Sequence, residues 1–185
     1  MLMKILPAAK KLMEEIVSPG DTVVDATCGN GHDTKFLAEL TGPGGIVYSF
    51  DIQKMAIDNA RELTVGLDNI EFILDSHSRI ESHIDMPVQA AMFNLGYLPK
   101  GDKSITTESE STIEALRQLF HLLKPGGRIV IVVYHGHEKG KDEKDALYDY
   151  LSRIPQQEAN ILEYRFINQK NNAPFILCME KTHKA

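Results

Sequence analysis

Apolar residues along this chain follow two alternating spacings, which predict a protein built from both strands and helices. Short apolar runs typical of buried strands alternate with segments whose apolar positions recur every three or four residues, as on one helix face. The predicted strands span residues 22–26, 46–51, 70–74, 88–93 and 128–134. The predicted helices span residues 3–17, 32–40, 54–64, 78–83, 108–123 and 138–154. Glycine-rich and proline-rich turns at residues 42–45 and 124–127 interrupt this pattern.

The last part of the chain has a different pattern. Two strand-like runs, 162–168 and 175–180, flank a polar turn and predict a β-hairpin within residues 160–183. Alternating strands and helices predict an α/β fold with a doubly wound, mostly parallel sheet. The hairpin would add a reversed strand to this sheet. We expect residues 1–185 to form a single domain that begins with a helix within residues 1–18.

The segment between Val23 and Thr34 carries the strongest chemical signal. A strand ends at Asp25, and the turn Gly29-Asn30-Gly31 then leads into a helix. Glycines in such a turn let backbone N–H groups approach a ligand closely. The third glycine of a dinucleotide fingerprint would fall at position 34, where the chain has threonine. An acid before the glycines suits a ligand with an ammonium group, such as S-adenosylmethionine.

Polar residues also follow the other predicted strands. Asp51 closes the second strand, at the position where acidic residues bind a ribose diol. Asp75, Asn94 and His135 come after later strands. Ligands of doubly wound sheets bind beyond the carboxyl ends of the strands. We therefore expect these side chains to surround one ligand site.

Composition and charge narrow the choice of partner and compartment. The net charge is −6, so a nucleic-acid site would have to be a local basic patch. Cys28 and Cys178 are far apart, and the chain shows no signal peptide, which together predict a reducing, cytoplasmic environment. No apolar run is long enough to span a membrane, so we expect no membrane association.

Several motifs in order resemble the class I S-adenosylmethionine-dependent methyltransferases. Residues 25–31 resemble motif I, Asp51 the ribose-binding acid, Asp75-Ser76 the adenine contact, and residues 122–127 the turn before strand five. The resemblance implies a seven-stranded Rossmann-like methyltransferase sheet with a reversed terminal strand. It also implies S-adenosylmethionine as the cofactor.

Three segments further resemble the small rRNA methylase / MnmM family. They are residues 25–34, residues 94–99 with Asp102, and residues 134–137. MnmM proteins methylate the aminomethyl group on the 5-position of the wobble uridine in tRNA. The resemblance therefore implies transfer of a methyl group to an amine nitrogen of tRNA, catalysed by an enzyme.

The expected site residues fall into two groups. The cofactor side comprises Asp25, Thr27, Gly29, Asn30, Gly31, His32, Asp33, Asp51, Ile52, Asp75, Ser76 and Asn94. The catalytic side comprises Asn94, Tyr97, His135 and His137. Asp33 also suits a plainer role, because an acid in the first turn of a helix is stabilised by the helix dipole.

The residues on the catalytic side suit an amine acceptor. The side-chain carbonyl of Asn94 can accept an amine N–H and aim the nitrogen lone pair at the methyl group. Asn94 occupies the place of the Asn-Pro-Pro-Tyr-type motif of amino-methylating enzymes, with Leu95-Gly96 in place of the prolines. Tyr97 would stack on a base or line the pocket. His135 and His137 suit a general base, a substrate contact or a structural hydrogen bond, and no third ligand supports a metal site.

Other functions stay open on the sequence alone. The acidic charge suits a methyltransferase of small molecules, and rRNA is a further acceptor to consider. A nicotinamide-dependent oxidoreductase is another alternative, but it would need the third glycine and a parallel final strand. A protein that binds the cofactor without catalysing a reaction is the last alternative. A tRNA substrate would need rim lysines, for which the candidates are Lys100, Lys103, Lys139, Lys141 and Lys144. A homodimer is also open.

Overall fold

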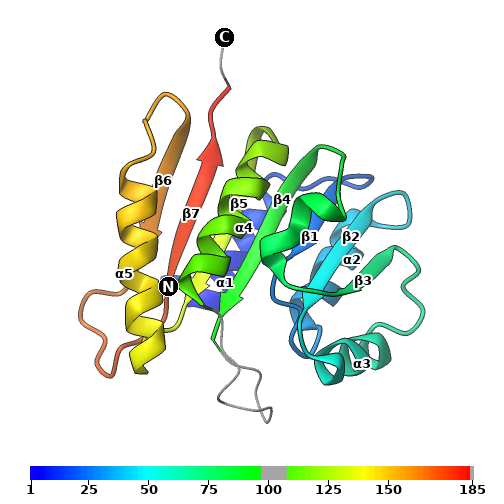
Figure 1. The fold of residues 1–185 in the computed structure, drawn as a ribbon, viewed down its shortest axis with the longest axis horizontal. Coiled ribbons are helices and arrows are strands. Elements are labelled where there is room, and N and C mark those ends of the chain that lie inside the picture. Colours follow the sequence, from blue (N-terminus) through cyan, green and yellow to red (C-terminus); the bar gives the residue numbers. More distant parts are fainter. Residues whose placement is uncertain (97–107, 184–185) are drawn as a thin grey trace.

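The centre of the computed structural model, which describes residues 1–96 and 108–183, is a seven-stranded sheet (Figure 1). The strands are β1 (Thr22–Asp25), β2 (Ile46–Asp51), β3 (Ile70–Leu74), β4 (Val88–Leu95), β5 (Leu123–Val133), β6 (Ala159–Tyr164) and β7 (Phe175–Lys181). They lie in the order β3-β2-β1-β4-β5-β7-β6. β1 to β5 run parallel, and β7 is antiparallel to both of its neighbours. The predicted doubly wound sheet with a reversed terminal strand is confirmed.

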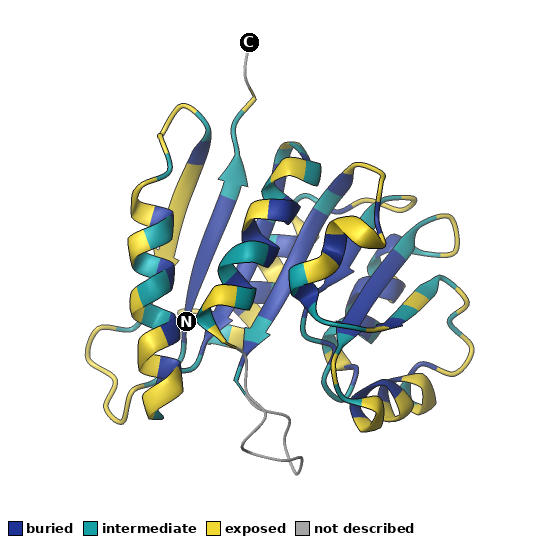
Figure 2. Ribbon diagram, in the orientation of Figure 1, coloured by how far each residue is buried: buried dark blue, intermediate teal, exposed yellow. Residues whose placement is uncertain are grey.

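Helices cover both faces of this sheet. They are α1 (Ile5–Glu14), α2 (His32–Thr41), α3 (Lys54–Leu63), the 3₁₀ helix η1 (His77–Ser82), α4 (Ser109–Leu122) and α5 (Glu138–Ser152). One apolar core lies under η1, α4 and α5, and a second lies under α1 and α2 on the opposite face. The strands between the two cores are therefore buried on both sides, while the outer helix faces are exposed (Figure 2).

Most predicted elements lie within a few residues of the observed bounds, and the differences have local causes. β4 continues to Leu95, so Asn94 pairs with Val132 inside the sheet instead of following the strand. The predicted turn at residues 124–127 is an irregular segment within β5, where the register with β4 shifts. A Cβ atom at Gly127 would lie 2.7 Å from the carbonyl oxygen of Gln89, so the segment runs close against β4.

The terminal hairpin also differs from its prediction. Its first strand ends at Tyr164 instead of Asn168, because pairing with β7 begins at Tyr164 opposite Ile176. The connection between the two strands is correspondingly longer and reaches the carboxyl edge of the parallel strands (Figure 1). Within the described residues, no helix has the length and apolar content needed to cross a bilayer.

Candidate active site

A cavity of about 770 Å³ lies at the carboxyl ends of the parallel strands. Its walls come from the β1–α2 loop, the ends of β2, β4 and β5, the start of α5, and α1. This is the edge of a doubly wound sheet at which ligands bind. The residues that were predicted from the sequence and line this cavity are Thr27, Gly29, Asn30, His32, Asp33, Asp51, Asn94, His135 and His137.

The glycine turn after β1 contacts both the end of β2 and α3. Gly29 has a φ of 54°, and its N–H donates to Asp51 Oδ2 at 2.9 Å. Gly31 has a φ of 91°, and a Cβ atom there would lie 2.6 Å from the Cβ of Ala60 in α3. Both positions therefore need glycine. Gly29 adopts a positive φ while it donates its N–H to the end of β2, and Gly31 leaves room for α3.

Asp25 lies beneath this turn and is fully buried. Its carboxylate accepts the Thr34 hydroxyl at 2.6 Å and the Thr27 N–H at 3.1 Å. Burial, and then the negative charge of Asp33, raise the pKa of Asp25 to about 7. Asp25 is not part of the cavity wall. Both carboxylate oxygens accept hydrogen bonds from the protein, and a direct contact of Asp25 with an ammonium group stays a prediction.

Asp51 lies in the cavity wall at the end of β2. One of its carboxylate oxygens accepts the Gln53 N–H at 2.9 Å, and the other accepts the Gly29 N–H. Burial raises the pKa of Asp51, while these backbone bonds act in the opposite direction. A carboxylate oriented in this way can accept two more hydroxyl protons, as a ribose diol requires. The acid and the glycine turn thus fit the nucleoside part of S-adenosylmethionine.

Asn94 is bound to the glycine segment through both backbone and side chain. Its backbone N–H donates to Thr27 Oγ1 at 2.7 Å, and its side-chain Nδ2 donates to Asp33 Oδ2 at 3.3 Å. Asp33 lies in the first turn of α2, so this contact joins two walls of the cavity. Because the carboxylate holds the amide nitrogen, the orientation of the acceptor atom Oδ1 is set as well.

The two histidines at the end of β5 each make a structural contact. His135 Nε2 lies 3.0 Å from the carbonyl oxygen of Ala173, which assigns the ring proton to Nε2. His137 is the N-cap of α5, where its Nδ1 accepts the Gly140 N–H at 3.0 Å. Both residues also line the cavity. The bond to Ala173 leaves the Nδ1 lone pair of His135 for chemistry, whereas the lone pair of a neutral His137 ring accepts the Gly140 N–H.

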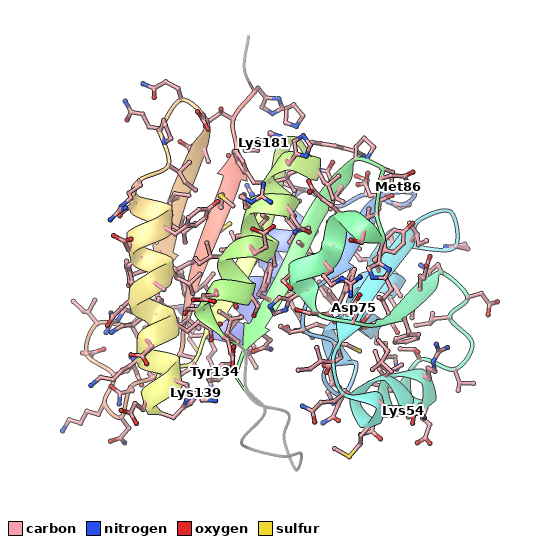
Figure 3. All side chains as sticks on the ribbon, in the orientation of Figure 1. Lys54, Asp75, Met86, Tyr134, Lys139 and Lys181 are labelled. Atoms are coloured by element: carbon pink, nitrogen blue, oxygen red, sulfur yellow. The ribbon has the colours of Figure 1, made fainter. Side chains whose placement is uncertain are left out.

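Several predicted site residues do not line the cavity. Asp75 accepts the Ser76 N–H and binds His83 Nε2, each at 2.8 Å, and the His83 bond lowers the pKa of Asp75. Figure 3 shows Asp75 on the β3 side, apart from Tyr134 at the cavity. Ile52 is 57% exposed and lies outside the wall. Tyr97 lies outside the described residues.

Other cavity residues were not predicted from the sequence. They include Leu6, Ala9 and Lys10 of α1, together with Gln53, Tyr134 and Asn172. The α1 segment reads as an ordinary amphipathic helix, and nothing local shows that its face reaches a ligand site. Asn172 sits in the β6–β7 connection with a φ of 51°, and an asparagine there is equally typical of a simple turn. Among the described residues, no three His, Cys, Asp or Glu side chains gather as metal ligands would.

The sheet order, the reversed β7 and the glycine-lined cavity define a class I methyltransferase that uses S-adenosylmethionine. The sequence model of the family described as "Putative rRNA methylase" matches residues 47–180. The chain belongs to this family.

Known relatives support this placement over nearly the whole chain. A protein of Arabidopsis thaliana named tRNA (mnm(5)s(2)U34)-methyltransferase, chloroplastic, is 37% identical over 96% of this chain and 69% of its own length. The crystal structure of a "putative rRNA-methylase" from Clostridium thermocellum has 44% identity and a TM-score of 0.95, covering 98% of this chain and 100% of the other. A "putative methyltransferase" from Streptococcus mutans, solved in complex with SAH, has 34% identity and a TM-score of 0.90, with 98% and 99% covered. The expected enzyme class and cofactor are thus confirmed.

Proposed function

We propose that this enzyme methylates an amine nitrogen on RNA, namely the 5-aminomethyl group of the wobble uridine in tRNA. The observation that carries the proposal is the Asn94 side chain, which Asp33 orients at the wall of the cavity. The Arabidopsis relative, whose name specifies a modified uridine at position 34 of tRNA, supports the same acceptor.

The chemistry follows from what these side chains can do. Bound S-adenosylmethionine would supply an electrophilic methyl group, and the electrons of the broken C–S bond would return to sulfur as S-adenosylhomocysteine leaves. Asn94 Oδ1 accepts an N–H of the amine, which turns the nitrogen lone pair toward that methyl group, and Asp33 keeps the amide from rotating. Alignment of two reactants can contribute roughly 7–11 kcal/mol to lowering the barrier.

A protonated amine has no lone pair, so a base must take one proton before the transfer. His135 is the candidate base, because it lines the cavity just beyond the end of β5. His137 lines the cavity too, but the lone pair of its neutral ring, on Nδ1, accepts the Gly140 N–H, so we assign it a substrate contact. In the neutral tautomer assigned by the Ala173 contact, the lone pair of His135 is on Nδ1. After transfer, the methylated ammonium loses a second proton to solvent.

The cofactor side is proposed from the cavity wall. Asp51 binds the ribose hydroxyls, and Thr27, Gly29, Asn30, His32 and Asp33 surround the remainder of the cofactor. Asp25 and Gly31 support the turn from below. Two further sets of expectations stay predictions. One is contact with the ligands by Ile52, Asp75 and Ser76 and stacking by Tyr97. The other is a single domain, a homodimer and a cytoplasmic location.

A methyl-transfer assay tests the proposal. Labelled S-adenosylmethionine is offered with tRNA that lacks the modification, with tRNA that carries the 5-aminomethyl group, and with fully modified tRNA. Parallel reactions contain rRNA or small amines. We expect label only in the aminomethylated tRNA, at the wobble nucleoside. Label in rRNA alone would move the proposed target to that RNA.

A small-molecule amine is the second candidate acceptor. The net charge of −6 favours it, and a cavity of about 770 Å³ is within the usual range for small ligands. Label in a small amine, with none in any RNA, would establish this alternative and remove the RNA acceptor. The methyltransferase class would be unaffected by that outcome.

A further inference from the structure

Two segments far apart in the sequence contain basic residues and no acidic ones. Residues 1–13 contain Lys4, Lys10 and Lys11, and residues 164–179 contain Arg165 and Lys170. The whole chain has 26 Asp and Glu residues, so two acid-free stretches of this kind are local departures from its acidic composition. They create the local basic surface that an acidic protein would need to bind a polyanion.

These two segments are neighbours in the folded protein. The hydroxyl of Tyr164, at the end of β6, donates to the carbonyl oxygen of Met3 at 2.6 Å. In Figure 1 the N-terminus lies next to the connection between β6 and β7. Both segments also reach the cavity, since α1 contributes Lys10 to its wall and the β6–β7 connection contributes Asn172. The two segments therefore form one continuous border of the active site.

Three lysines of the two segments lack acidic neighbours, whereas Lys11 lies 3.7 Å from Glu14 and Arg165 lies 3.7 Å from Glu163. Within residues 1–96 and 108–183, no carboxylate lies within 4.0 Å of the Nζ atoms of Lys4, Lys10 or Lys170. Lys10 instead lies 5.1 Å from the centre of the Phe36 ring. By contrast, Arg117 and Arg153 each lie 2.6 Å from a carboxylate on their own helix.

We propose that Lys4, Lys10 and Lys170, the basic border, bind the phosphate backbone of the RNA whose nucleoside enters the cavity. The inference rests on the proposed RNA substrate. Phosphates are attracted to cations whose charge no protein carboxylate neutralises, and each contact releases condensed counterions from the RNA. Because the rest of this acidic protein repels RNA, the border would also orient the strand so that its nucleoside faces the cavity.

A pair of matched double variants tests the basic border. Lys4→Ala with Lys170→Ala removes two border charges without changing the cavity wall. Arg117→Ala with Arg153→Ala removes two charges from exposed ion pairs on α4 and α5 and serves as the control. We measure KM and kcat with aminomethylated tRNA, and the affinity of labelled anticodon stem-loop RNA at increasing salt.

For the border variant we expect KM to rise by roughly five-fold or more, with kcat and S-adenosylmethionine affinity unchanged. The slope of log affinity against log salt should become shallower by about 1.4, since each single-strand phosphate contact contributes about 0.7. The control should match the unmodified protein in both measurements.

Two results would overturn the inference without affecting the proposed function. In one, the border variant keeps the KM and salt slope of the unmodified enzyme. In the other, the control loses as much affinity as the border variant. If the unmodified protein methylates no tRNA but binds the stem-loop through the border, the proposed acceptor is wrong and the surface stands. If the unmodified protein binds no RNA at any salt concentration, both the proposed RNA acceptor and the proposed role of the basic border are wrong.

Discussion

At the scale of single residues, the role of Asn94 depends on a partner 61 positions away. An asparagine at a strand end is uninformative alone, because it can simply cap the strand. The Asp33 carboxylate holds its amide nitrogen and thereby presents Oδ1 as an acceptor. Asp25 shows the opposite case, in which a residue expected to touch the ligand is buried beneath the loop.

Asn94→Ala is expected to abolish turnover while preserving cofactor affinity. The substitution removes the acceptor for the amine N–H, so kcat should fall by about 100-fold or more, as for loss of a group that positions a reactant. The dissociation constant for S-adenosylmethionine, measured by calorimetry, should change by less than about three-fold, because Asp51 and the glycine turn are untouched.

The matched control for Asn94→Ala is Asn160→Ala, an exposed position on the edge strand β6. It should leave kcat and cofactor affinity unchanged. If Asn94→Ala instead weakened cofactor binding in proportion to the loss of kcat, the assignment of Asn94 to the acceptor side would be wrong.

Asp25→Asn is expected to change how stability depends on pH. The pKa of Asp25 is about 7 in the folded protein and near 3.8 in the unfolded chain. The folded state therefore holds this proton more tightly, and its stabilising contribution is complete below pH 3.8 and is lost as pH rises to about 7. Asparagine does not ionise, so the loss of stability with rising pH disappears. The Thr34 hydroxyl can donate to the Ser49 hydroxyl instead of to a carboxylate.

Urea unfolding between pH 4 and 8 measures this effect. Relative to the unmodified protein, Asp25→Asn should gain stability as pH rises, by about 1 kcal/mol or more, since one pKa unit corresponds to about 1.4 kcal/mol. Asp68→Asn, at an exposed acid before β3, should keep the pH dependence of the unmodified protein. Parallel curves for the unmodified protein and Asp25→Asn would contradict the shifted pKa.

At the scale of elements, the β1–α2 turn is the feature best predicted from sequence. Its glycines, the strand before it and the helix after it all occur as expected. Packing adds the reason for the second glycine, because α3 lies against Gly31. The turn thus connects β1 to α2 and packs against α3, and its shape depends on the close contact between Gly31 and Ala60.

Gly31→Ala is expected to weaken cofactor binding strongly. The new Cβ would lie 2.6 Å from Ala60 Cβ, so the turn or α3 must shift. Gly66→Ala is a matched control, since Gly66 has the same φ of 91° with nothing within 4 Å of an added Cβ. Backbone strain alone should cost each variant roughly 1–3 kcal/mol of stability.

Calorimetry and thermal unfolding separate the two contributions for these glycine variants. Only Gly31→Ala should also raise the dissociation constant for S-adenosylmethionine, by about ten-fold or more, as expected when a crowded substitution moves a binding loop by a fraction of an ångström. Equal effects of the two variants on cofactor affinity would show that α3 does not determine the position of the turn.

At the scale of the whole molecule, β7 links the terminal hairpin to the parallel sheet. It pairs with both β5 and β6, and its side chains are buried in the cores on both faces. Cys178 lies in this strand and is 3% exposed, and burial raises the pKa of its thiol to about 12. A thiol in this environment reacts only when the strand opens.

Cys178 should therefore report global unfolding. At pH 8 we expect alkylation of this thiol to be slow in the native protein and fast in urea, and mass spectrometry distinguishes it from Cys28. Saturating S-adenosylmethionine should slow the labelling, because ligand binding lowers the population of the unfolded state. Labelling that is fast and insensitive to the cofactor would show that the hairpin opens independently of the cavity.

The sequence alone determined the features that depend on neighbouring residues. β2 and β3 were predicted with the observed bounds, since apolar periodicity and flanking turns define a strand locally. The glycine turn and Asp51 at the end of β2 indicated a nucleoside ligand for the same reason. Family motifs, which are also local patterns, implied the reversed strand that the sheet contains.

Only the tertiary structure decided which side chains meet. It turned Asp25 into the interior, joined Asn94 to Asp33, and brought α1 and the β6–β7 connection to the same border of the cavity. Such contacts link residues separated by many positions, and they follow from how helices pack on a twisted sheet. Periodicity along the chain records which face of an element is buried, but it does not record what lies against that face.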